Sequence, residues 1–497
     1  MSVRALFGVG LVAVLVALVG SPSAGVGATG YLYTLDGPNL ASTASPFTGC
    51  SVEAEDSNNV NFPNTEPEPF VAVNPTNPLN VIGVYQQDRW SSGAAKAQGT
   101  AASTDGGVTW PNHAFVPFSA CAGGNPDYQR TTDPWVTFDP AGNAYQISLP
   151  VSSDLEVSSV AVSKSADGGV SWDAPKTLIR DETGLNFNDK ESITADPTRP
   201  GYVYAVWDRG SFPSDRMASI ATFHSFAYRG QPMISRTTDY GASWSTPVGM
   251  ADTNIFTIGN QIAVEPDGTL VDVFTEFRGS GLQPSANQFF EAVMISKDAG
   301  RTWSQPIKIS NIAFTNLVDP DNGLPVRAGD YLPDIAVDPQ SGDLYVVWAD
   351  ARFGDGTYFD IVMSKSTDGG HKWTTPKVVD TAPGGVSAFN GTVEVTGDGT
   401  VAVLWYDFRE NDPAPGLPTD VFLRHSHDGG ATFGVAQKLA GPFDMEAAPL
   451  SFGAGFFRGY FLGDYQGLAA AGNDLIAFFT TTDGDRANVY SVRAVAP

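Results

Sequence analysis

Short apolar stretches alternate with turn residues along nearly the whole chain. Each unit has a short apolar run, a tight turn and a second run rich in Val, Trp and Tyr, such as DIAVDPQSGDLYVVWAD at 334–350. Apolar runs of this length, separated by Gly, Pro, Asn and Asp, are typical of β-strands joined by hairpins. The pattern recurs seven times, at 69–86, 135–148, 192–208, 261–277, 334–350, 392–407 and 467–481. It predicts an all-β repeat protein.

A second motif, Ser/Thr-x-Asp-x-Gly-x-x-aromatic, follows each of the first six units. Its aspartates lie 59 to 72 residues apart, and they are Asp105, Asp167, Asp239, Asp298, Asp368 and Asp428. Asp and Ser/Thr side chains accept hydrogen bonds from turn amides, Gly supplies a left-handed backbone, and the aromatic side chain returns into the core. Each unit is therefore predicted to hold four strands, denoted A to D, with this turn motif between C and D.

The seventh unit ends after its third predicted strand, at 488–494. The segment around 46–53 is predicted to supply the missing strand D, because pairing the two ends of the chain would close a ring and leave no exposed sheet edge. The predicted architecture is one seven-bladed β-propeller over residues 60–497. A six-bladed ring with a divergent terminal hairpin is the alternative.

The N-terminus has the features of an export signal. Arg4 precedes an apolar run of 14 residues at 6–19, and Val26-Gly27-Ala28 has the shape of a cleavage site, with Ala24 as a second option. The run is shorter than the ~20 residues of a membrane-spanning helix, so we expect a secreted, extracellular protein rather than an anchored one. Residues 1–28 are then the signal peptide, and 29–59 are an N-terminal segment that includes the ring-closing strand.

The net charge of the chain narrows the classes of partner that it could bind. The chain has 28 Lys and Arg against 54 Asp and Glu, a net charge of −26. This charge argues against nucleic acid and anionic membranes as partners, because clustered Lys and Arg bind both.

In an oxidising compartment Cys50 and Cys121 are expected to form one disulfide, with two buried thiols as the alternative. We expect a monomer that requires no cofactor. The oxygen-rich loop at 319–323 (Asp-Pro-Asp-Asn-Gly) is a candidate Ca²⁺ site, with a solvated loop as the alternative.

The repeated Ser-x-Asp-x-Gly-x-x-Trp is similar to the Asp box of the sialidase (neuraminidase) superfamily, and the resemblance covers about residues 60–497. In that family the boxes are structural and lie on the face opposite the active site. The resemblance therefore implies that the functional face carries the starts of the A strands and the ends of the B strands. Polar residues gather at the A-strand starts: Glu66, Glu68, Arg130, Asp133, Asp189, Lys190, Glu191, Asn260, Gln261, Asp330, Tyr331, Asp334, Asn390, Asp464, Tyr465 and Gln466.

Sialidases hold the carboxylate of an acidic sugar with three arginines, and they use a tyrosine nucleophile, a glutamate that activates it and an aspartate acid/base. The resemblance implies that Tyr331 or Tyr465 is the nucleophile, with Glu191 or Glu276 to activate it. The aspartate would be Asp330, Asp189 or Asp464. An acid followed closely by arginine ends five B strands, and the arginines that would bind substrate are Arg209, Arg278, Arg352 and Arg409. The alternative is that these acid–arginine pairs are structural salt bridges that repeat with the fold.

The predicted function is that of a secreted exo-glycosidase of the sialidase type, acting on terminal acidic sugars of extracellular glycans. Two alternatives stay open, because a fold alone does not decide function. A non-catalytic propeller would bind glycan or protein through the same face. Another glycan-active enzyme, such as a polysaccharide lyase, would carry out a different reaction there.

Overall fold

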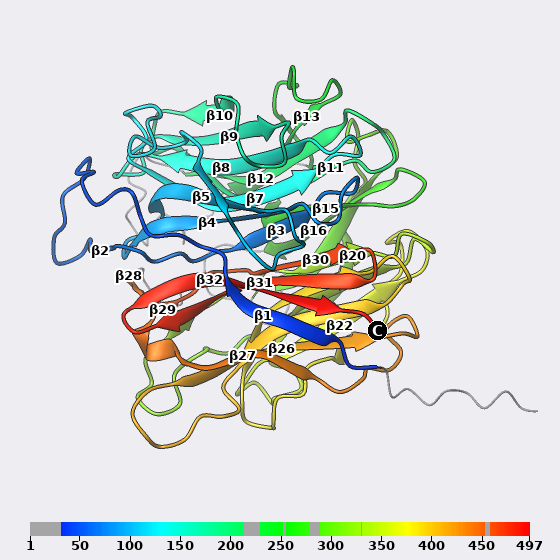
Figure 1. Ribbon diagram of the computed structural model, residues 1–497. Helices are drawn as coiled ribbons and strands as arrows, with labels where there is room; N and C mark the ends of the chain where they lie inside the picture. Colours follow the sequence, from blue (N-terminus) through cyan, green and yellow to red (C-terminus); the bar gives the residue numbers. More distant parts are fainter. Residues whose placement is uncertain (1–30, 213–228, 252–254, 278–288, 330, 453–457) are drawn as a thin grey trace, which may run out of the picture.

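The chain folds almost entirely into β-strands. The computed structural model describes residues 31–212, 229–251, 255–277, 289–329, 331–452 and 458–497 (Figure 1). This part of the chain has 32 strands and a single 3₁₀ turn, Met445–Ala447. None of its helices is long and apolar enough to cross a membrane. The all-β prediction is confirmed.

Within the described residues, 28 of these strands pair into seven antiparallel groups of four. The first six groups are β3 (Phe70–Val73), β4 (Val81–Trp90), β5 (Ala95–Ser103) and β6 (Asn112–Phe115); β7 (Arg130–Phe138), β8 (Ala144–Val151), β9 (Ser158–Ser165) and β10 (Lys176–Asp181); β11 (Asn186–Ala195), β12 (Val203–Ser211), β13 (Arg229–Thr237) and β14 (Val248–Gly249); β15 (Phe256–Val264), β16 (Leu270–Phe277), β17 (Phe289–Ser296) and β18 (Ile307–Asn311); β20 (Asp334–Val337), β21 (Leu344–Asp350), β22 (Asp360–Ser366) and β23 (Lys377–Val378); and β24 (Ala388–Val395), β25 (Val401–Asp407), β26 (Pro418–Ser426) and β27 (Gln437–Asp444). The seventh consists of β30 (Gly467–Ala471), β31 (Asp474–Asp483), β32 (Arg486–Val495) and β1 (Thr34–Leu40).

Four short strands lie outside these groups. β2 (Asn61–Phe62) pairs with β4, and β19 (Val326–Arg327), β29 (Arg458–Phe461) and β28 (Leu450–Phe452) form a small sheet. In this sheet β19 runs parallel to β29. The segment before β20 is therefore joined to the segment before β30.

The first strand of each group contacts the first strand of the next group. The order is β3, β7, β11, β15, β20, β24 and β30, and β30 in turn contacts β3. Apolar side chains fill the space between the groups, and Trp207, Trp348 and Trp405 are fully buried there. The starts of these seven strands therefore meet around one axis.

The strand that completes the seventh group is β1, so the prediction that 46–53 has this role is wrong. β1 pairs antiparallel with β32, from Thr34 opposite Val495 to Leu40 opposite Tyr490. In Figure 1 the blue strand β1 lies along the red strands near the C-terminus. The 46–53 segment is not a strand. It begins with a proline, which has no amide hydrogen for a ladder, and it turns where the Cys50 amide donates to the Phe47 carbonyl.

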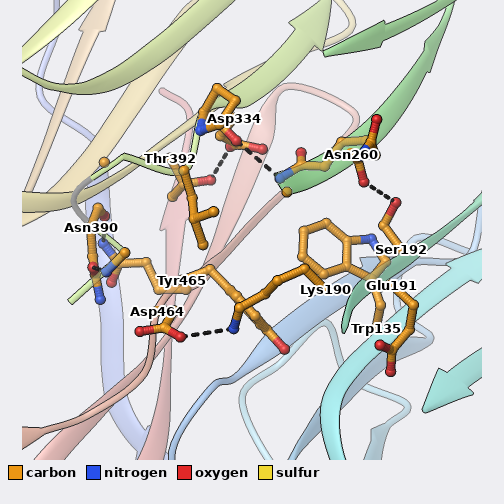
Figure 2. Close-up of a pocket in the computed structure, with 17 residues that line it drawn as sticks. Trp135, Lys190, Glu191, Ser192, Asn260, Asp334, Asn390, Thr392, Asp464 and Tyr465 are labelled. Carbon is orange, nitrogen blue, oxygen red and sulfur yellow. Dashed lines mark hydrogen bonds and ion pairs between the residues drawn. The ribbon is translucent and has the colours of Figure 1, made fainter. Parts of the chain in front are cut away.

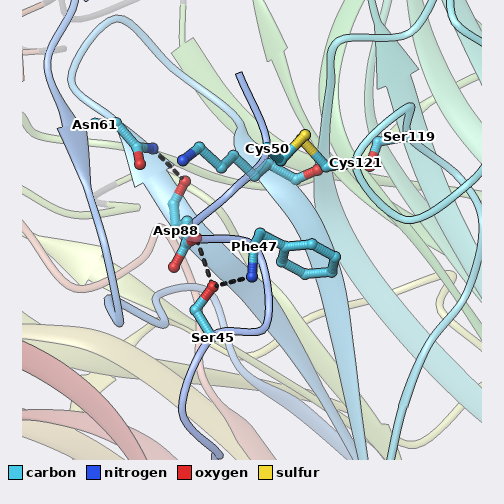
Figure 3. Close-up of a disulfide and its surroundings, with 8 residues drawn as sticks. Ser45, Phe47, Cys50, Asn61, Asp88, Ser119 and Cys121 are labelled. Carbon is cyan, nitrogen blue, oxygen red and sulfur yellow. Dashed lines mark hydrogen bonds between the residues drawn. A yellow bond between two sulfur atoms is a disulfide. The ribbon is translucent and has the colours of Figure 1, made fainter. Parts of the chain in front are cut away.

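The predicted disulfide between Cys50 and Cys121 is present, across a sequence separation of 71 residues (Figure 3). It ties the N-terminal segment to the loop that follows β6, and Cys50 lies outside the closing strand β1. Beside it, the Ser45 hydroxyl donates to the Asp88 carboxylate at 2.6 Å. A disulfide is consistent with an extracellular protein.

The repeated turn motif makes the hydrogen bonds that its residue types predict. Asp105 accepts from the Thr109 amide at 2.8 Å and from the Thr109 hydroxyl at 2.6 Å, while the Ser103 hydroxyl accepts from the Gly107 amide at 2.9 Å. The same amide bond to the aspartate recurs in the other five copies. These bonds stay within each turn, so the motif aspartates serve local structure.

Candidate functional site

Four of the seven innermost strands share an irregularity where they begin. The register of the hydrogen-bonded pairs shifts at Thr132/Trp135 in β7, Asp189/Ser192 in β11, Ile258/Gln261 in β15 and Phe389/Thr392 in β24. A residue of positive φ lies in each shift: Asp133 (53°), Lys190 (47°), Gly259 (74°) and Asn390 (49°). Such bulges re-aim side chains and are common next to active sites. Here they gather polar side chains at one end of the axis.

Lys190 stands at the centre of these side chains (Figure 2). Its Nζ lies 2.8 Å from Asp464 Oδ2, 3.3 Å from Glu68 Oε1 and 3.4 Å from Asp133 Oδ1. Its own side chain is 10% exposed, so a buried cation joins three acids from three different groups of strands. We call Glu68, Asp133, Lys190, Glu191, Arg327, Asp464 and Tyr465 the axial cluster.

Asp464 precedes β30 and is held by two cations. Arg327 Nη2 lies 2.7 Å from Asp464 Oδ2, the same oxygen that Lys190 contacts. Burial alone would raise the pKa of Asp464, but Arg327 and Lys190 together hold this pKa well below its usual range. These two cations therefore favour the ionised form of Asp464.

Glu191 is in the opposite electrostatic situation. It is 2% exposed, and neither of its carboxyl oxygens has a hydrogen-bond partner within the described part of the chain. Burial and the charge of Asp133 raise the pKa of Glu191 well above its usual range. A raised pKa favours the protonated carboxyl group, and a protonated carboxyl group is suited to donate a proton.

Aromatic side chains border the cluster. The Tyr465 hydroxyl donates to the Pro134 carbonyl at 3.2 Å, and the Tyr465 ring lies 5.2 Å from the ring of Trp135. Trp135 stacks on Phe70 at 3.6 Å. Burial and the neighbouring acids, Glu68 first among them, raise the pKa of the Tyr465 hydroxyl, so the hydroxyl is neutral in the free protein.

Asn390 and Asp334 form the opposite side of the site. Asn390 accepts from the Gly329 amide at 3.0 Å and donates to the Gly463 carbonyl at 2.8 Å. Asp334 accepts from the Val393 amide at 2.8 Å and from the Thr392 hydroxyl. Burial raises the pKa of Asp334 to about 6. These bonds hold the starts of β20, β24 and β30 together.

A narrow cavity of about 40 Å³ lies among these side chains. It has room for a few water molecules and is smaller than a sugar ring. Of the predicted catalytic residues, Glu191, Asp464 and Tyr465 line it, together with Trp135 and Lys190. Trp135 also lines a second cavity of about 430 Å³ farther along the inner strands, where Glu394 is the only acid.

The other predicted catalytic residues either do not line this cavity or lie outside the described residues. Asp189 precedes Lys190, whose amide donates to Asp189 Oδ1 at 3.0 Å. Tyr331 packs near Phe277 and Phe314, with ring centroids 6.1 and 6.3 Å away. Glu276 is buried at the end of β16. Asp330 and Arg278 lie outside the described residues.

The predicted substrate arginines that the structure describes are each held by an aspartate. The pairs are Arg209–Asp181, Arg352–Asp350 and Arg409–Asp407. Arg352 Nη2 lies 2.6 Å from Asp350 Oδ2, and the same oxygen accepts the Trp348 indole N–H at 2.9 Å. None of these three arginines lines the axial cavity. Their geometry is that of the structural salt bridges considered as the alternative.

Arg327 is the site residue that sequence reasoning did not single out. It lies on β19, a strand of two residues that belongs to none of the seven groups. No repeat marks its position, and only the parallel pairing of β19 with β29 places it beside Asp464. Lys190, Glu68 and Asp133 stood among the polar A-strand starts, but nothing in their spacing assigned them to one cluster.

In the described part of the chain, no three His, Cys, Asp or Glu side chains converge as metal ligands would. The cluster therefore offers acids, an amine and a guanidinium, with no preformed metal centre among its described residues. The cluster favours the protonated form of the Glu191 carboxyl group and the ionised form of the Asp464 carboxyl group.

No family model matches this chain, and no curated protein matches it. Among solved structures it is similar to the Hadza microbial sialidase Hz136, at 15% identity and a TM-score of 0.48, over 82% of this chain and 75% of that one. It is similar to the α-L-arabinofuranosidase Arb93A from Fusarium graminearum at 16% identity and a TM-score of 0.45, over 69% of this chain and 88% of that one. A protein of unknown function from Dyadobacter fermentans has 14% identity and a TM-score of 0.46, over 75% of this chain and 96% of that one.

Proposed function

We propose that this protein is a secreted glycoside hydrolase built on a seven-bladed β-propeller whose repeated turns are Asp boxes. The observation that carries the proposal is the pair of carboxyl groups at the axial cavity. Both line this cavity; burial raises the pKa of Glu191, whereas Arg327 and Lys190 lower the pKa of Asp464. Hydrolysis of a glycosidic bond needs one carboxyl group in each state.

In this proposal Glu191 donates its proton to the glycosidic oxygen as the bond to the sugar breaks. The Asp464 carboxylate stabilises the positive charge that develops on the sugar ring. In the sialidase-type form of this mechanism Tyr465 is the nucleophile: its hydroxyl proton passes to a carboxylate of the axial cluster as its oxygen bonds to the sugar carbon. Water then breaks this bond, gives one proton back to Glu191 and releases the sugar. Tyr331 is the other tyrosine to be tested. Because the cavity holds only a few water molecules, the sugar would lie at its opening with the scissile bond toward Glu191.

Terminal acidic sugars are the substrates that the sialidase resemblance implies. Arg327 and Lys190 are the cations of the axial cluster, and both already pair with Asp464. A sugar carboxylate would therefore bind them in competition with Asp464. A neutral sugar would meet no such competition, so both classes belong in the test.

The test is hydrolysis of fluorogenic glycosides by the chain from residue 29 onward. The panel contains an α-sialoside, uronides and neutral pentosides and hexosides. For the substrate that is turned over, Glu191→Gln is expected to lower kcat about 100-fold or more. Tyr465→Phe and Tyr331→Phe then show which tyrosine is needed, and Glu394→Gln, which removes a carboxyl group from the second cavity, is the control.

Turnover of neutral sugars alone would reject the acidic-sugar part of the proposal. No turnover of any glycoside by a folded sample would reject the hydrolase itself. The second candidate function, non-catalytic binding of glycan or protein, would then be preferred. The observation that favours it is that Lys190 and Arg327 are already neutralised by acids, as in a structural network. Binding on a glycan array without hydrolysis would support it.

A further inference from the structure

We propose a Ca²⁺-binding site between the loop at 319–323 and the 3₁₀ turn Met445–Ala447. The loop leads into β19, and the turn lies between β27 and β28. Asn322 Nδ2 donates to Glu446 Oε1 at 2.7 Å, which holds the loop against the turn across 124 residues of sequence. This site is separate from the axial cavity and does not rest on the proposed hydrolase.

Asp319 presents a buried carboxylate oxygen to this site. The residue is 1% exposed; its Oδ1 accepts from the Asp321 amide at 2.9 Å, and its Oδ2 has no hydrogen-bond partner in the described chain. The Asp319 carboxyl group faces that of Glu446, which Asn322 of the same loop contacts. Two facing carboxylates need a shared proton or a cation between them.

The surroundings are acidic and lack a described counter-ion. Asp444 and Asp321 lie beside Asp319 and Glu446, and Tyr460 is near three of these four acids. None of the four forms an ion pair with a Lys, Arg or His in the described part of the chain. A bound cation would neutralise this charge.

A second oxygen without a partner belongs to Asn411. Its Nδ2 donates to Asp321 Oδ2 at 2.9 Å, and its Oδ1 is buried with no partner among the described residues. An amide oxygen and carboxylates are the hard ligands that Ca²⁺ prefers, and Ca²⁺ tolerates an irregular shell of 6–8 oxygens that includes water. Mg²⁺ requires a stricter octahedron.

The acids do not converge as three on one point, so the ion would be held by Asp319 and Glu446, with Asn411 and water completing the shell. Such a shell predicts weak binding, with a Kd of about 10⁻⁴–10⁻³ M, as in extracellular modules. Because the loop leads into β19, which carries Arg327, the ion would also anchor the approach to the axial cluster.

The experiment titrates chelator-treated protein, from residue 29 onward, with Tb³⁺ and with Ca²⁺. Tyr460 lies within hydrogen-bonding range of Asn322, so excitation of tyrosine is expected to give sensitised Tb³⁺ emission that Ca²⁺ displaces. Calorimetry then gives the Ca²⁺ affinity directly. Asp319→Asn and Glu446→Gln are expected to weaken this affinity at least about ten-fold. Tyr460→Phe is expected to lower the emission while the calorimetric affinity stays unchanged.

Asp483→Asn is the matched control, because Asp483 is an exposed acid on β31. Absence of Ca²⁺ binding by the folded wild-type chain would overturn the proposal, and so would equal affinities in the wild type, Glu446→Gln and Asp483→Asn. Glu446 is only half-buried, so its variant decides the question even if Asp319→Asn does not fold.

Discussion

At the scale of single residues, a few residues with a left-handed backbone conformation help to position the charged side chains of the axial cluster. Asp133, Lys190 and Asn390 have φ between 47° and 53°, a region that costs a residue with a Cβ about 1 kcal/mol or more. Each lies in a bulge at the start of an inner strand. The surrounding pairing and the ion pairs of Lys190 offset this cost, so the strain is retained where the charges meet.

The pH dependence of activity follows from the two carboxyl groups. The reaction needs Asp464 ionised and Glu191 protonated, and the pKa of Asp464 is lowered while that of Glu191 is raised. We therefore expect kcat/KM to be flat through the acidic range and to fall as the pH rises through the pKa of Glu191. The descending limb should be absent in Glu191→Gln. A descending limb that survives in this variant would assign the acid to another residue.

Asp272 offers a stability test. It is fully buried in β16, neither carboxylate oxygen has a partner among the described residues, and burial raises its pKa well above its usual range. An acid whose pKa is higher in the folded state than in the unfolded state loses stability as the pH rises above about 4. Asp272→Asn is therefore expected to gain at least about 1 kcal/mol over the wild type between pH 4 and pH 7.

Calorimetric melting at several pH values would measure this gain for Asp272→Asn, with Asp483→Asn as the exposed control. A difference from the wild type that stays the same at pH 4 and pH 7 would contradict a protonated Asp272.

At the scale of strands and turns, local hydrogen bonds and covalent links set the frame. Each motif aspartate accepts hydrogen bonds inside its own turn, as Asp428 does from the Thr432 amide at 2.8 Å. Arg352, Asp350 and Trp348 form a similar local network at the end of β21. Such contacts repeat because the same few residues recur in each unit. The asymmetric contacts, those of Lys190 and Arg327, are the ones that build a site.

The Cys50–Cys121 disulfide acts at this scale, because it fixes the N-terminal segment to the loop after β6. The two cysteines are 71 residues apart in sequence, so replacing both by serine is expected to lower the free energy of unfolding by about 4 kcal/mol. Denaturant unfolding would measure the loss. Turnover should be retained in native conditions, since neither cysteine lines the axial cavity.

If the double Cys→Ser variant unfolded with less than about 1 kcal/mol of lost stability, the N-terminal segment would be held by its noncovalent contacts. The ion pair of Arg130 with Glu53 and the Ser45–Asp88 hydrogen bond are the contacts that would do this.

At the scale of the whole molecule, strands from the N-terminal and C-terminal parts of the described chain pair with each other. β1 adds the fourth strand to the group of β30, β31 and β32. The N-terminal segment is anchored further where the Tyr33 amide donates to Gln437 Oε1 at 2.8 Å and Gln437 Nε2 donates to the Tyr33 carbonyl at 3.0 Å. Without β1, the backbone of β32 would present an unpaired edge.

A chain that begins at residue 43 tests this arrangement. It lacks β1, so we expect a lower melting temperature and self-association through the exposed edge of β32. Light scattering after size exclusion and thermal melting would report both effects, with a chain beginning at residue 31 as the control. A stable monomer with an unchanged melting temperature would show that β1 does not protect this edge.

Patterns of residues close together in the sequence were sufficient to predict much of the fold. The apolar runs at 334–350 correspond to β20 and β21, the turn motifs make the expected hydrogen bonds, and Cys50 pairs with Cys121. These features depend on residues close in sequence, or on the only two cysteines in the chain. The closing strand was placed wrongly because any strand-forming segment near the N-terminus could pair with β32, and only packing chose β1.

The axial cluster depends on contacts that no local pattern contains. Lys190 meets Glu68 and Asp464, which lie 122 and 274 residues away. Arg327 reaches Asp464 only because β19 pairs with β29. Glu191 and Asp464 are both acids near inner strands, yet burial without hydrogen-bond partners raises the pKa of Glu191, whereas two cations lower the pKa of Asp464. Residue type and spacing thus determine the strands and turns, whereas protonation and ion pairing depend on long-range packing and desolvation.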